Sequence, residues 1–349
     1  MSLKYGEIIK QMSLEEKALM MSGKNTWETV DFEKYGIPSM AMSDGPHGLR
    51  RQAGAGDHLG LNASLPATCF PTAATIANSW DEKLGEEIGT ALAEEAVTMD
   101  VNVILGPGLN IKRSPLCGRN FEYFSEDPYH AGKMAAAYVK GIQSKGISAC
   151  PKHFAANSQE LRRMASDSVV DERTFREIYT TGFEIAVKEG KSKSIMSSYN
   201  EVNGVYANEN RHMLQEILVD EWGFDGYFVS DCWAIRDFHE HHGLTKNAVE
   251  SAALALTAGC DVNCGCTYVN VLAALDEGLV TKEDIRKACV HLMRTRIRLG
   301  MFDDKTEFDD IPYNIVSCVE HKKVSLECAE KSMVLLKNLS LIHISEPTR

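Results

Sequence analysis

The chain has 349 residues, of which 44% are hydrophobic and 25% charged, and its formal net charge is −12. This composition is typical of a globular protein with one large core and an additional segment, and the absence of a Lys/Arg cluster argues against nucleic acid as a partner. No apolar run approaches the ~20 residues of a membrane span, and residues 1–20 are charged rather than a secretion signal, so we expect a cytoplasmic protein.

Six short apolar runs, each followed directly by polar residues or glycine, predict buried strands. They lie at residues 40–43, 101–105, 147–150, 194–198, 227–230 and 258–260. Six segments with a helical pattern alternate with them. These are residues 81–99, 128–144, 171–189, 208–222, 245–257 and 281–299. Asp81 and Thr281 stand at the start of two of these segments and are typical N-cap residues.

The alternation of strands and helices over about 250 residues predicts an α/β fold with a parallel sheet. Polar residues after nearly every strand favour a (β/α)8 TIM-type barrel, because the catalytic face of a barrel collects the carboxyl ends of all its strands. An open sheet is the alternative, but it gathers ligands mainly at one switch point. We therefore expect residues 1–300 to form a barrel domain.

A different organisation is expected after the barrel. Residues 301–318 are predominantly acidic at their start and are predicted to be a linker. Residues 320–331 predict a helix, and residues 332–336 predict a strand that has no partner in what remains of the chain. Residues 319–338 are therefore expected to begin a second domain that the chain does not complete.

The last eleven residues, 339–349, have an unusual sequence. They resemble the translation of a transposase adapter used in DNA sequencing libraries. We expect them to be a non-native tail, with a natural polar tail as the alternative, and we exclude them from reasoning about the fold.

Asp231 is the single acid at the end of the 227–230 run. A carboxylate at the end of a buried strand is costly unless it faces a pocket in which it is used. Other predicted strand ends and the loops after them carry charged side chains that a barrel would bring toward Asp231. They are Asp44, Arg119, Lys152, His153 and Arg163. Such a pocket suits a ligand covered in hydroxyl groups, such as a sugar.

Aromatic side chains and cations complete this predicted pocket. Tyr199 and Trp233 could pack on the apolar face of a sugar ring, while Lys152, His153 and Arg119 would hold Asp231 ionised at neutral pH, as a nucleophile requires. Each residue alone also fits a plainer role, as a turn salt bridge, a solvated strand end or a helix cap. Taken together these plainer roles are disfavoured, because several charges would crowd one barrel face without purpose.

The cluster of Cys260, Cys264 and Cys266 has two interpretations, a metal site or reduced thiols. No second cysteine pair or histidine cluster stands at zinc-site spacing around it, which favours reduced thiols. Without a secretion signal, disulfides are not expected. We therefore expect neither a metal nor a cofactor.

Six motifs resemble those of family 3 glycoside hydrolases of the β-glucosidase type. In chain order they are SDGPHGLR at 43–50, FPTA at 70–73, GRNFEYFSEDP at 118–128, KHFAANSQE at 152–160, SSYNEVNG at 197–204 and YFVSD at 227–231. The resemblance covers nearly the whole chain to Asn338. It implies a (β/α)8-like barrel, often irregular in its first strands, followed by an α/β sandwich domain.

The resemblance also assigns roles to residues. It implies that Asp231 is the nucleophile of a retaining reaction that passes through a glycosyl-aspartate intermediate and releases non-reducing terminal β-D-glucosyl residues. The positions that match the sugar subsite are Asp44, Arg50, Arg119, Lys152, His153, Arg163 and Tyr199. The expected ligand is a small β-glycoside or oligosaccharide, and no membrane partner is expected.

The resemblance further implies that the acid/base glutamate comes from the sandwich domain. Glu122 and Glu160 are the nearest acids in the motifs, but neither matches that role. We therefore expect this chain to lack the acid/base residue and to hydrolyse natural glucosides poorly.

Alternatives for the substrate and the activity stay open. Cys232 stands where many β-glucosidases have tryptophan. Residues 230–235 and 259–265 resemble β-xylosidases more, whereas the Asp44 motif resembles glucosidases more. The loop that begins at Lys152 lacks the second histidine of the β-N-acetylglucosaminidase branch. Two other classes remain: a metal-dependent hydrolase with His153 and Asp231 as ligands, and a non-catalytic sugar-binding remnant.

Overall fold

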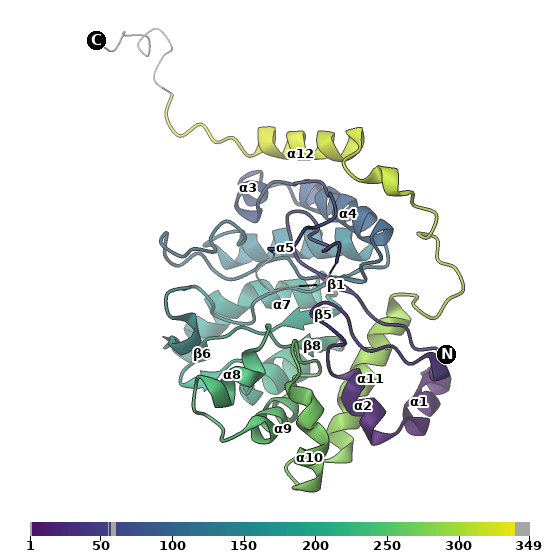
Figure 1. The fold of residues 1–349 in the computed structure, drawn as a ribbon. Coiled ribbons are helices and arrows are strands. Elements are labelled where there is room, and N and C mark those ends of the chain that lie inside the picture. Colours follow the sequence, from purple (N-terminus) through teal and green to yellow (C-terminus); the bar gives the residue numbers. More distant parts are fainter. Residues whose placement is uncertain (1, 55, 57–60, 339–349) are drawn as a thin grey trace.

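Short parallel strands lie at the centre of the fold and are surrounded by helices (Figure 1). The computed structural model describes residues 2–54, 56 and 61–338. The central strands are β1 (Met42–Ser43), β2 (Val103–Ile104), β3 (Ser148–Ala149), β5 (Ser194–Met196) and β8 (Tyr227–Val229). They pair in parallel in the orders β1-β2-β3 and β5-β8. Each is only two or three residues long.

Isolated bridges extend this pairing beyond the named strands. Parallel bridges join Phe154 to Ser197, Val229 to Val262, and Ser22 to Asn263. Antiparallel bridges join Gly23 to Thr29 and Glu28 to Ala41 at the beginning of the chain. No named sheet of the described residues is closed on itself.

A second small sheet lies outside this central group. It consists of β4 (Asp167–Ser168), β6 (Glu201–Val202) and β7 (Val205–Tyr206), in the order β4-β6-β7. The β6–β7 pair is an antiparallel hairpin, with Asn203 and Gly204 in left-handed backbone conformations at its turn.

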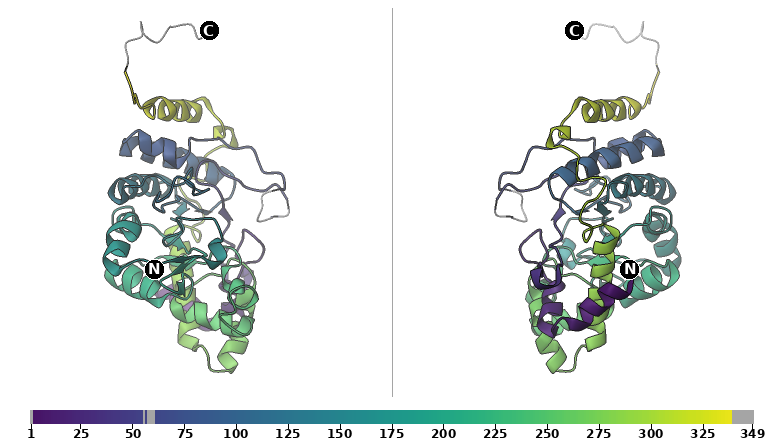
Figure 2. Two further views of the ribbon diagram at one scale, coloured as in Figure 1. Left: turned by 90° about the vertical axis from the view of Figure 1, so that its left-hand side faces the viewer. Right: turned by 90° about the vertical axis from the view of Figure 1, so that its right-hand side faces the viewer.

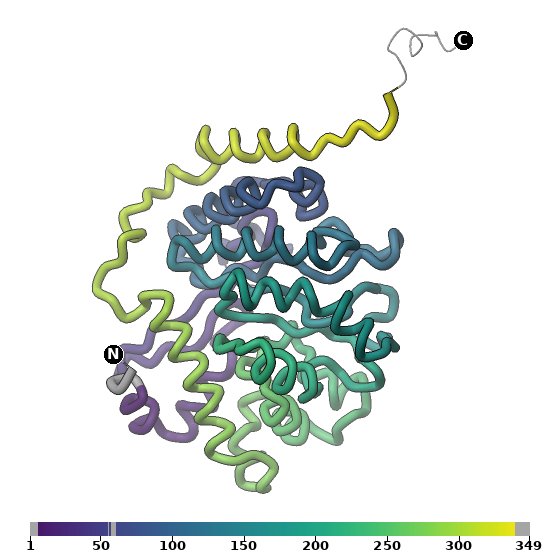
Figure 3. The backbone as a smooth tube through the Cα atoms, turned by 180° about the vertical axis from the view of Figure 1, so that it is seen from behind, coloured from purple at the N-terminus to yellow at the C-terminus, as the bar shows by residue number. Residues whose placement is uncertain are grey.

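The larger helices pack on the outside of the strands in chain order. Figure 3 shows α4 (Glu82–Thr98), α5 (Pro128–Gln143) and α7 (Thr181–Lys188) stacked side by side, and α5 contacts both of the others. The remaining α-helices are α1 (Ser2–Gln11), α2 (Leu14–Met20), α3 (Ala73–Asn78), α6 (Glu172–Thr174), α8 (Ala234–Glu240), α9 (Ala248–Ala258), α10 (Val271–Asp276), α11 (Lys282–Arg298) and α12 (Val319–Lys331). Two π-helical segments are η3 (Phe175–Thr180) and η4 (His212–Glu221), and 3-10 turns are η1 (Glu33–Tyr35), η2 (Arg163–Ala165), η5 (Thr267–Asn270) and η6 (Tyr313–Ile315).

The six predicted helical segments are confirmed, and so are both predicted caps. The Asp81 side chain accepts a hydrogen bond from the Leu84 amide, and Thr281 forms a capping box with Asp284. The 171–189 segment is one continuous helical stretch whose middle, η3, is π-helical.

Two predicted strands are wrong. Residues 258–260 contain the end of α9, which stops at Gly259 because this glycine adopts a left-handed conformation with φ of 115°. The pairing with β8 occurs further along, at Val262. Residues 332–336 form no strand, and the apolar side chains of residues 333–336 are exposed. None of the helices in the described ranges is both long and apolar enough to cross a membrane.

The segment after α11 forms an arm that carries α12 across the outside of the fold (Figures 1 and 2). Helix α12 contacts α3 and α4. At its start, His321 is buried, and its ring nitrogens lie 2.8 Å from a Glu95 oxygen and 3.2 Å from a Glu94 oxygen of α4. Glu95 also accepts hydrogen bonds from the amides of Thr68 and Ser317. The predicted helix at 320–331 is therefore confirmed, whereas residues 339–349 lie outside the described residues.

Candidate active site

Asp231 lies directly after β8, where the strand stops and the chain turns. Its side chain is only 13% exposed. Its amide donates to Ser197 Oγ at 3.0 Å, and its Oδ1 accepts from the Cys232 amide at 2.7 Å. These two bonds fix both the backbone and the carboxylate of Asp231.

His153, in the loop after β3, faces this carboxylate. Its Nε2 lies 3.7 Å from Asp231 Oδ2, and its Nδ1 lies 3.3 Å from the Tyr123 hydroxyl. Two hydrogen bonds between its backbone and the Asn110 side chain, at 2.8 and 3.0 Å, hold its position. Burial, reinforced by Arg119 and other nearby cations, lowers the pKa of His153 well below its ordinary value. A lowered pKa disfavours the charged imidazolium, so the expectation that His153 helps to hold Asp231 ionised is not supported.

Lys152 and Asp44 form the second pair of the site. Lys152 Nζ lies 2.8 Å from Asp44 Oδ1. Burial tends to raise the pKa of Asp44, but the charges of Lys152, Arg50 and Arg119 outweigh it and lower that pKa. Burial likewise opposes the charge on Lys152, and Asp44 outweighs it, so the pKa of Lys152 is raised. Each member of the pair therefore stabilises the charged form of the other.

Arg163 and Tyr199 lie on another side of Asp231. The Arg163 guanidinium lies 4.5 Å from the centroid of the Tyr199 ring, and it forms an ion pair with Glu160 at 3.0 Å. The Tyr199 hydroxyl donates to the carbonyl of Cys232, the residue after Asp231. Arg119 forms a buried ion pair with Glu122.

Opposed effects act on the pKa of the Asp231 carboxyl group. Burial raises the pKa of Asp231, although Arg119, the Cys232 amide, Lys152 and Arg163 all act to lower it. A raised pKa of this direction does not contradict an ionised Asp231 at neutral pH, which stays a prediction. The cations limit a desolvation penalty that would otherwise be larger.

A cleft of about 500 Å³ opens beside the Asp44–Lys152 pair, and Asp231, His153, Arg163 and Tyr199 are not among its lining residues. Asp44, Arg50, Arg119, Lys152 and Glu122 contribute to its lining, together with residues 67–69. The buried Arg50 Nε and Nη2 atoms have no hydrogen-bond partner within the described residues. Since buried polar atoms are normally paired, these atoms are available to a ligand in the cleft.

The comparison with known proteins decides the family. Residues 4–295 match the family model described as the glycosyl hydrolase family 3 N terminal domain. The chain belongs to glycoside hydrolase family 3. Its fold is α/β and is similar to the TIM-barrel-like N-terminal domains of the family. The α/β part of the predicted fold class is therefore confirmed, whereas the closed (β/α)8 barrel stays a prediction.

Individual family 3 proteins resemble it over nearly its whole length. It is 44% identical over 342 residues to Thermostable beta-glucosidase B of Acetivibrio thermocellus, covering 97% of this chain and 42% of the relative. Beta-glucosidase 3B of Thermotoga neapolitana, solved with glucose, has a TM-score of 0.83 and 36% identity, covering 96% and 47% of the two chains. The exo-β-xylosidase XlnD, solved with a xylobiose aziridine probe, has a TM-score of 0.87 and 26% identity, covering 97% and 46%. The chain spans less than half the length of these relatives.

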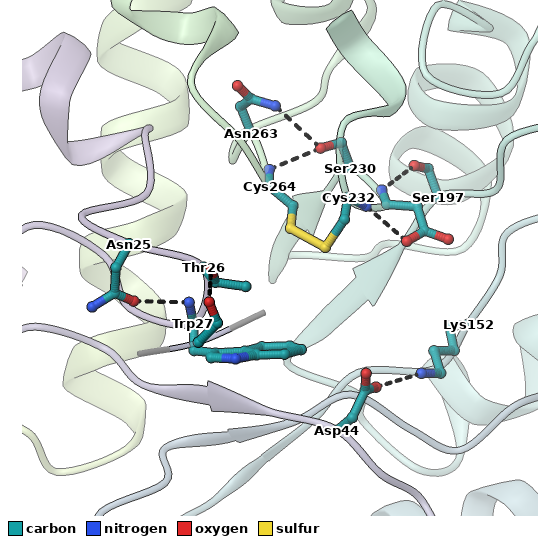
Figure 4. The surroundings of a disulfide bond; sticks show 12 residues. Asn25, Thr26, Trp27, Asp44, Lys152, Ser197, Ser230, Cys232, Asn263 and Cys264 are labelled. Atoms are coloured by element: carbon teal, nitrogen blue, oxygen red, sulfur yellow. Dashed lines mark hydrogen bonds and ion pairs between the residues drawn. A yellow bond between two sulfur atoms is a disulfide. The ribbon is translucent and has the colours of Figure 1, made fainter. Parts of the chain in front are cut away.

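A disulfide is the main unpredicted feature of this family 3 site. Cys232 and Cys264 are bonded, next to Asp231 (Figure 4). The expectation that the chain has no disulfide is therefore wrong, and so is the expectation of a reduced thiol at Cys264. Cys260 is buried with its Sγ 3.5 Å from the Val262 carbonyl oxygen, and Cys266 is exposed. The predicted cysteine cluster is thus divided among three different environments.

Trp233 is half-buried and begins α8 in a left-handed conformation, with φ of 67°. Its amide donates to the Cys264 carbonyl at 2.8 Å, and its ring lies 4.3 Å from the Arg236 guanidinium. One face of the Trp233 indole is therefore covered by the Arg236 guanidinium. Its predicted contact with a sugar stays a prediction.

Sequence reasoning missed three residues that hold the family 3 site in place: Asn110, Tyr123 and Ser197. Ser197 lies at the end of the predicted strand 194–198, and Asn110 follows the predicted strand 101–105 in the next loop, so the rule of polar strand ends could have found them. Tyr123 lies inside the 118–128 motif, but its contact with His153 depends on tertiary packing that spacing does not reveal.

Proposed function

We propose that this chain is the sugar-binding and nucleophile-bearing domain of a retaining β-glucosidase. The observation that supports this most is the position of Asp231. Asp231 follows β8, its amide donates to Ser197 Oγ, and its carboxylate accepts from the Cys232 amide and lies 3.7 Å from His153 Nε2. The Asp44–Lys152 pair and the unpartnered nitrogens of Arg50 stand nearby and suit the hydroxyl groups of a pyranose.

In this proposal, the ionised Asp231 attacks the anomeric carbon as the aglycone departs. The bond from the anomeric carbon to the aglycone oxygen breaks, and an ester to Asp231 forms. Arg119 and Lys152 oppose the raised pKa of Asp231 and so favour the ionised form that attacks. Water then hydrolyses the ester and releases the sugar with retained configuration.

The second carboxyl group that retention requires is proposed to lie outside the barrel domain. The acids of the predicted site are engaged: Glu122 with Arg119, Glu160 with Arg163, and Asp44 with Lys152. We accordingly keep the proposed division into a barrel at 1–300, a linker at 301–318 and the start of a second domain at 319–338. The bridges at Ser22, Glu28, Phe154 and Val229 support a closed barrel with antiparallel pairing in its first segments.

Glucose is the proposed sugar, because the relative with 44% identity and a structure solved with glucose are both named β-glucosidases. Two further relatives, at 40% and 39% identity, are named exo-α-(1→6)-L-arabinopyranosidases. Xylose is the second candidate. It is favoured by the high structural similarity to a β-xylosidase and by Cys232 in the place where many family members have tryptophan. The two sugars differ only in the C6 hydroxymethyl group of glucose. Comparing labelling by a 2-fluoro-glucoside with labelling by the corresponding 2-fluoro-xyloside therefore distinguishes them.

Covalent trapping tests the proposal directly. The chain is incubated with 2,4-dinitrophenyl 2-deoxy-2-fluoro-β-D-glucoside, whose leaving group needs no acid assistance, and labelling is followed by intact mass. We expect one glycosyl adduct per chain, mapped by peptide sequencing to Asp231. The variant Asp231→Asn should lose the adduct, with labelling slowed by at least about 10³-fold. Asp220→Asn, which changes an exposed acid, is the matched control and should label normally.

Other outcomes separate the alternatives. Reversible binding without an adduct would favour the non-catalytic sugar-binding remnant. Faster labelling by the corresponding 2-fluoro-xyloside would favour the β-xylosidase. A loss of activity on treatment with a strong chelator would support a metal-dependent hydrolase instead.

A further inference from the structure

The turn that carries Asp231 is joined covalently to a neighbouring loop at the very next residue. Cys232 is bonded to Cys264, 32 positions further along the chain. Figure 4 shows this bond linking the turn after β8 to the loop at Cys264, on the side that also holds the indole of Trp27. The crosslink is therefore one residue away from the proposed nucleophile.

Polar contacts place Cys232 against the reactive carboxylate. The Cys232 amide donates to Asp231 Oδ1 at 2.7 Å, and its carbonyl accepts from the Tyr199 hydroxyl. Both polar groups of this one peptide segment thus face the site. A change in the backbone of Cys232 would move the donor that fixes the Asp231 carboxylate.

Hydrogen bonds on the other side of the crosslink anchor the loop. The Cys264 amide donates to Ser230 Oγ at 2.9 Å, and the Trp233 amide donates to the Cys264 carbonyl at 2.8 Å. The Ser230 amide donates to the Val262 carbonyl at 3.0 Å. The loop is itself held against β8, so the disulfide transfers this rigidity to Cys232.

We propose that the Cys232–Cys264 disulfide is a positioning element for Asp231, and that its reduction by a dithiol lowers the rate at which Asp231 is glycosylated. The inference rests on the proposed function. In the reduction, dithiothreitol supplies two electrons and two protons; the sulfur–sulfur bond breaks, each cysteine gains a hydrogen, and the reductant closes to its own cyclic disulfide. A shift of a reacting group by about 1 Å costs about 10²-fold in rate, so a loss of about 10- to 100-fold is expected.

The test first establishes the redox state. Ten cysteines are present in the sequence, and eight are free. Iodoacetamide in denaturant should therefore add eight groups to the untreated chain and ten after treatment with dithiothreitol. Ten groups on the untreated chain would mean that the crosslink is absent and would overturn the inference.

The kinetic measurement compares the two redox states of the full chain. After the reductant is removed by desalting without air, labelling by the dinitrophenyl 2-fluoro-glucoside is followed by intact mass over a range of concentrations. Reduction should lower the maximal labelling rate about 10- to 100-fold. The half-saturating concentration should change by less than about threefold, because the Asp44–Lys152 pair that faces the sugar is not part of the crosslink. Reoxidation should restore the rate.

The pH dependence provides a readout that general loosening would not produce. The Cys232 amide is one of the groups that lower the pKa of Asp231. Losing this hydrogen bond raises that pKa, so the acid limb of the labelling rate should move to higher pH after reduction. The rate loss should accordingly be larger at about pH 5 than at about pH 8.

Two variants complete the experiment. The double variant Cys232→Ala/Cys264→Ala should match the reduced chain and should not respond to dithiothreitol. Cys266→Ala removes the exposed free cysteine two positions beyond Cys264 and should keep both the original rate and its loss on reduction. Circular dichroism of each form verifies that it is folded.

The outcomes distinguish the two proposals. Equal maximal rates before and after reduction, with an adduct on Asp231 in both, would overturn the positioning role and leave the proposed function standing. No adduct in either redox state would overturn the proposed function and this inference with it. If reduction instead raised the half-saturating concentration about as much as it lowered the maximal rate, sugar binding rather than the position of Asp231 would be disturbed. This result would also overturn the positioning role of the disulfide.

Discussion

At the scale of single residues, Asp231 is controlled by two opposed effects. Burial raises its pKa, while Arg119, Lys152 and Arg163 lower it. A nucleophilic carboxylate needs a low pKa to be ionised but also limited hydration to be reactive. The cations therefore compensate for burial that the reaction itself requires.

The variant Arg119→Gln tests this balance. Without the Arg119 charge the pKa of Asp231 rises further, and less of the carboxylate is ionised at acidic pH. The acid limb of the labelling rate should move to higher pH, with about a tenfold lower rate per pKa unit below both pKa values. The control Arg176→Gln changes an arginine paired with Glu172 and Glu221 on the surface and should leave the profile unmoved. An unshifted profile in Arg119→Gln would contradict the assigned role.

At the scale of elements, α4 and α5 approach each other closely where glycines meet. A Cβ atom at Gly89 of α4 would overlap the Tyr138 carbonyl oxygen of α5 and lie 3.1 Å from the Ile142 amide nitrogen. A Cβ at Gly85, one turn earlier, would instead meet the terminal methyl group of Met134 at 3.3 Å, and that side chain is flexible. The two glycines of one helix are therefore constrained to different degrees.

Alanine at these two positions gives a matched comparison. Gly89→Ala should lower the free energy of unfolding by about 1–3 kcal/mol, because backbone overlap outweighs the helix propensity gain of about 1 kcal/mol. Gly85→Ala should be neutral or stabilising. Urea unfolding followed by circular dichroism measures both. Equal effects at the two sites would show that the close approach does not limit α4.

The contact of α12 with α4 depends on charges whose pKa values the fold changes. Burial opposes the charge on His321, but hydrogen bonds to Glu95 and Glu94 outweigh it and raise the pKa of His321. Burial also opposes the charges of Glu94 and Glu95, and their partners outweigh it, so both of these pKa values are lowered. Lys145 also contributes to the cluster, 2.8 Å from Glu94.

The signs of these shifts define a pH window for α12. The stabilisation of α12 by the charged His321 is complete below about pH 6.5 and is lost as the pH rises through the raised pKa of His321. The stabilisation of α12 by the charged Glu94 and Glu95 is complete above about pH 4.5. It is lost as the pH falls through the lowered pKa values of these two glutamates. Hydrogen-exchange protection of α12, corrected for intrinsic rates, should therefore be lower at about pH 8.5 than at about pH 5.5.

His321→Gln provides the corresponding variant test. It should remove this pH dependence and reduce the local stability of α12 by about 1–3 kcal/mol. His212→Gln, at an exposed histidine paired with Glu172 and Glu216, should leave α12 unchanged. Persistence of the pH dependence in His321→Gln would exclude His321 as its origin.

The sequence predicted those elements that depend on local pattern. The caps at Asp81 and Thr281 and the apolar run of β8 are encoded by neighbouring residues, and each was found at or near its predicted place. The strand at 258–260 failed because the same apolar residues complete α9, and only the left-handed Gly259 separates helix from bridge. The Cys232–Cys264 bond and the lowered pKa of His153 depend on distant segments and on burial, which a single sequence does not specify.

At the scale of the whole molecule, the proposed function divides the catalytic groups between this chain and a further part of the protein. With Glu122, Glu160 and Asp44 all engaged, no acid of the predicted site is free to protonate a leaving group. General acid–base catalysis contributes about 10²–10⁴-fold. Hydrolysis of cellobiose should therefore be slow, whereas dinitrophenyl β-glucoside should still glycosylate Asp231.

Azide tests this division without needing any further domain. Azide attacks the glycosyl-enzyme without a general base, so it should accelerate turnover of the dinitrophenyl glucoside and yield β-glucosyl azide. Product analysis by nuclear magnetic resonance identifies the anomer, and Asp231→Asn should form none of it. Rapid hydrolysis of cellobiose by the 349-residue chain without azide would contradict the proposal.

Glu95 has a consequence for engineering this molecule. One buried carboxylate receives hydrogen bonds from Thr68, which lines the cleft, and from Ser317 and His321 of the arm. We therefore expect a displacement of the arm to disturb the wall of the cleft at Thr68. A reporter or surface anchor fused after Lys331 should be attached through a flexible spacer. Cutting the chain before Ser317 would remove two of the three residues that hydrogen-bond to Glu95.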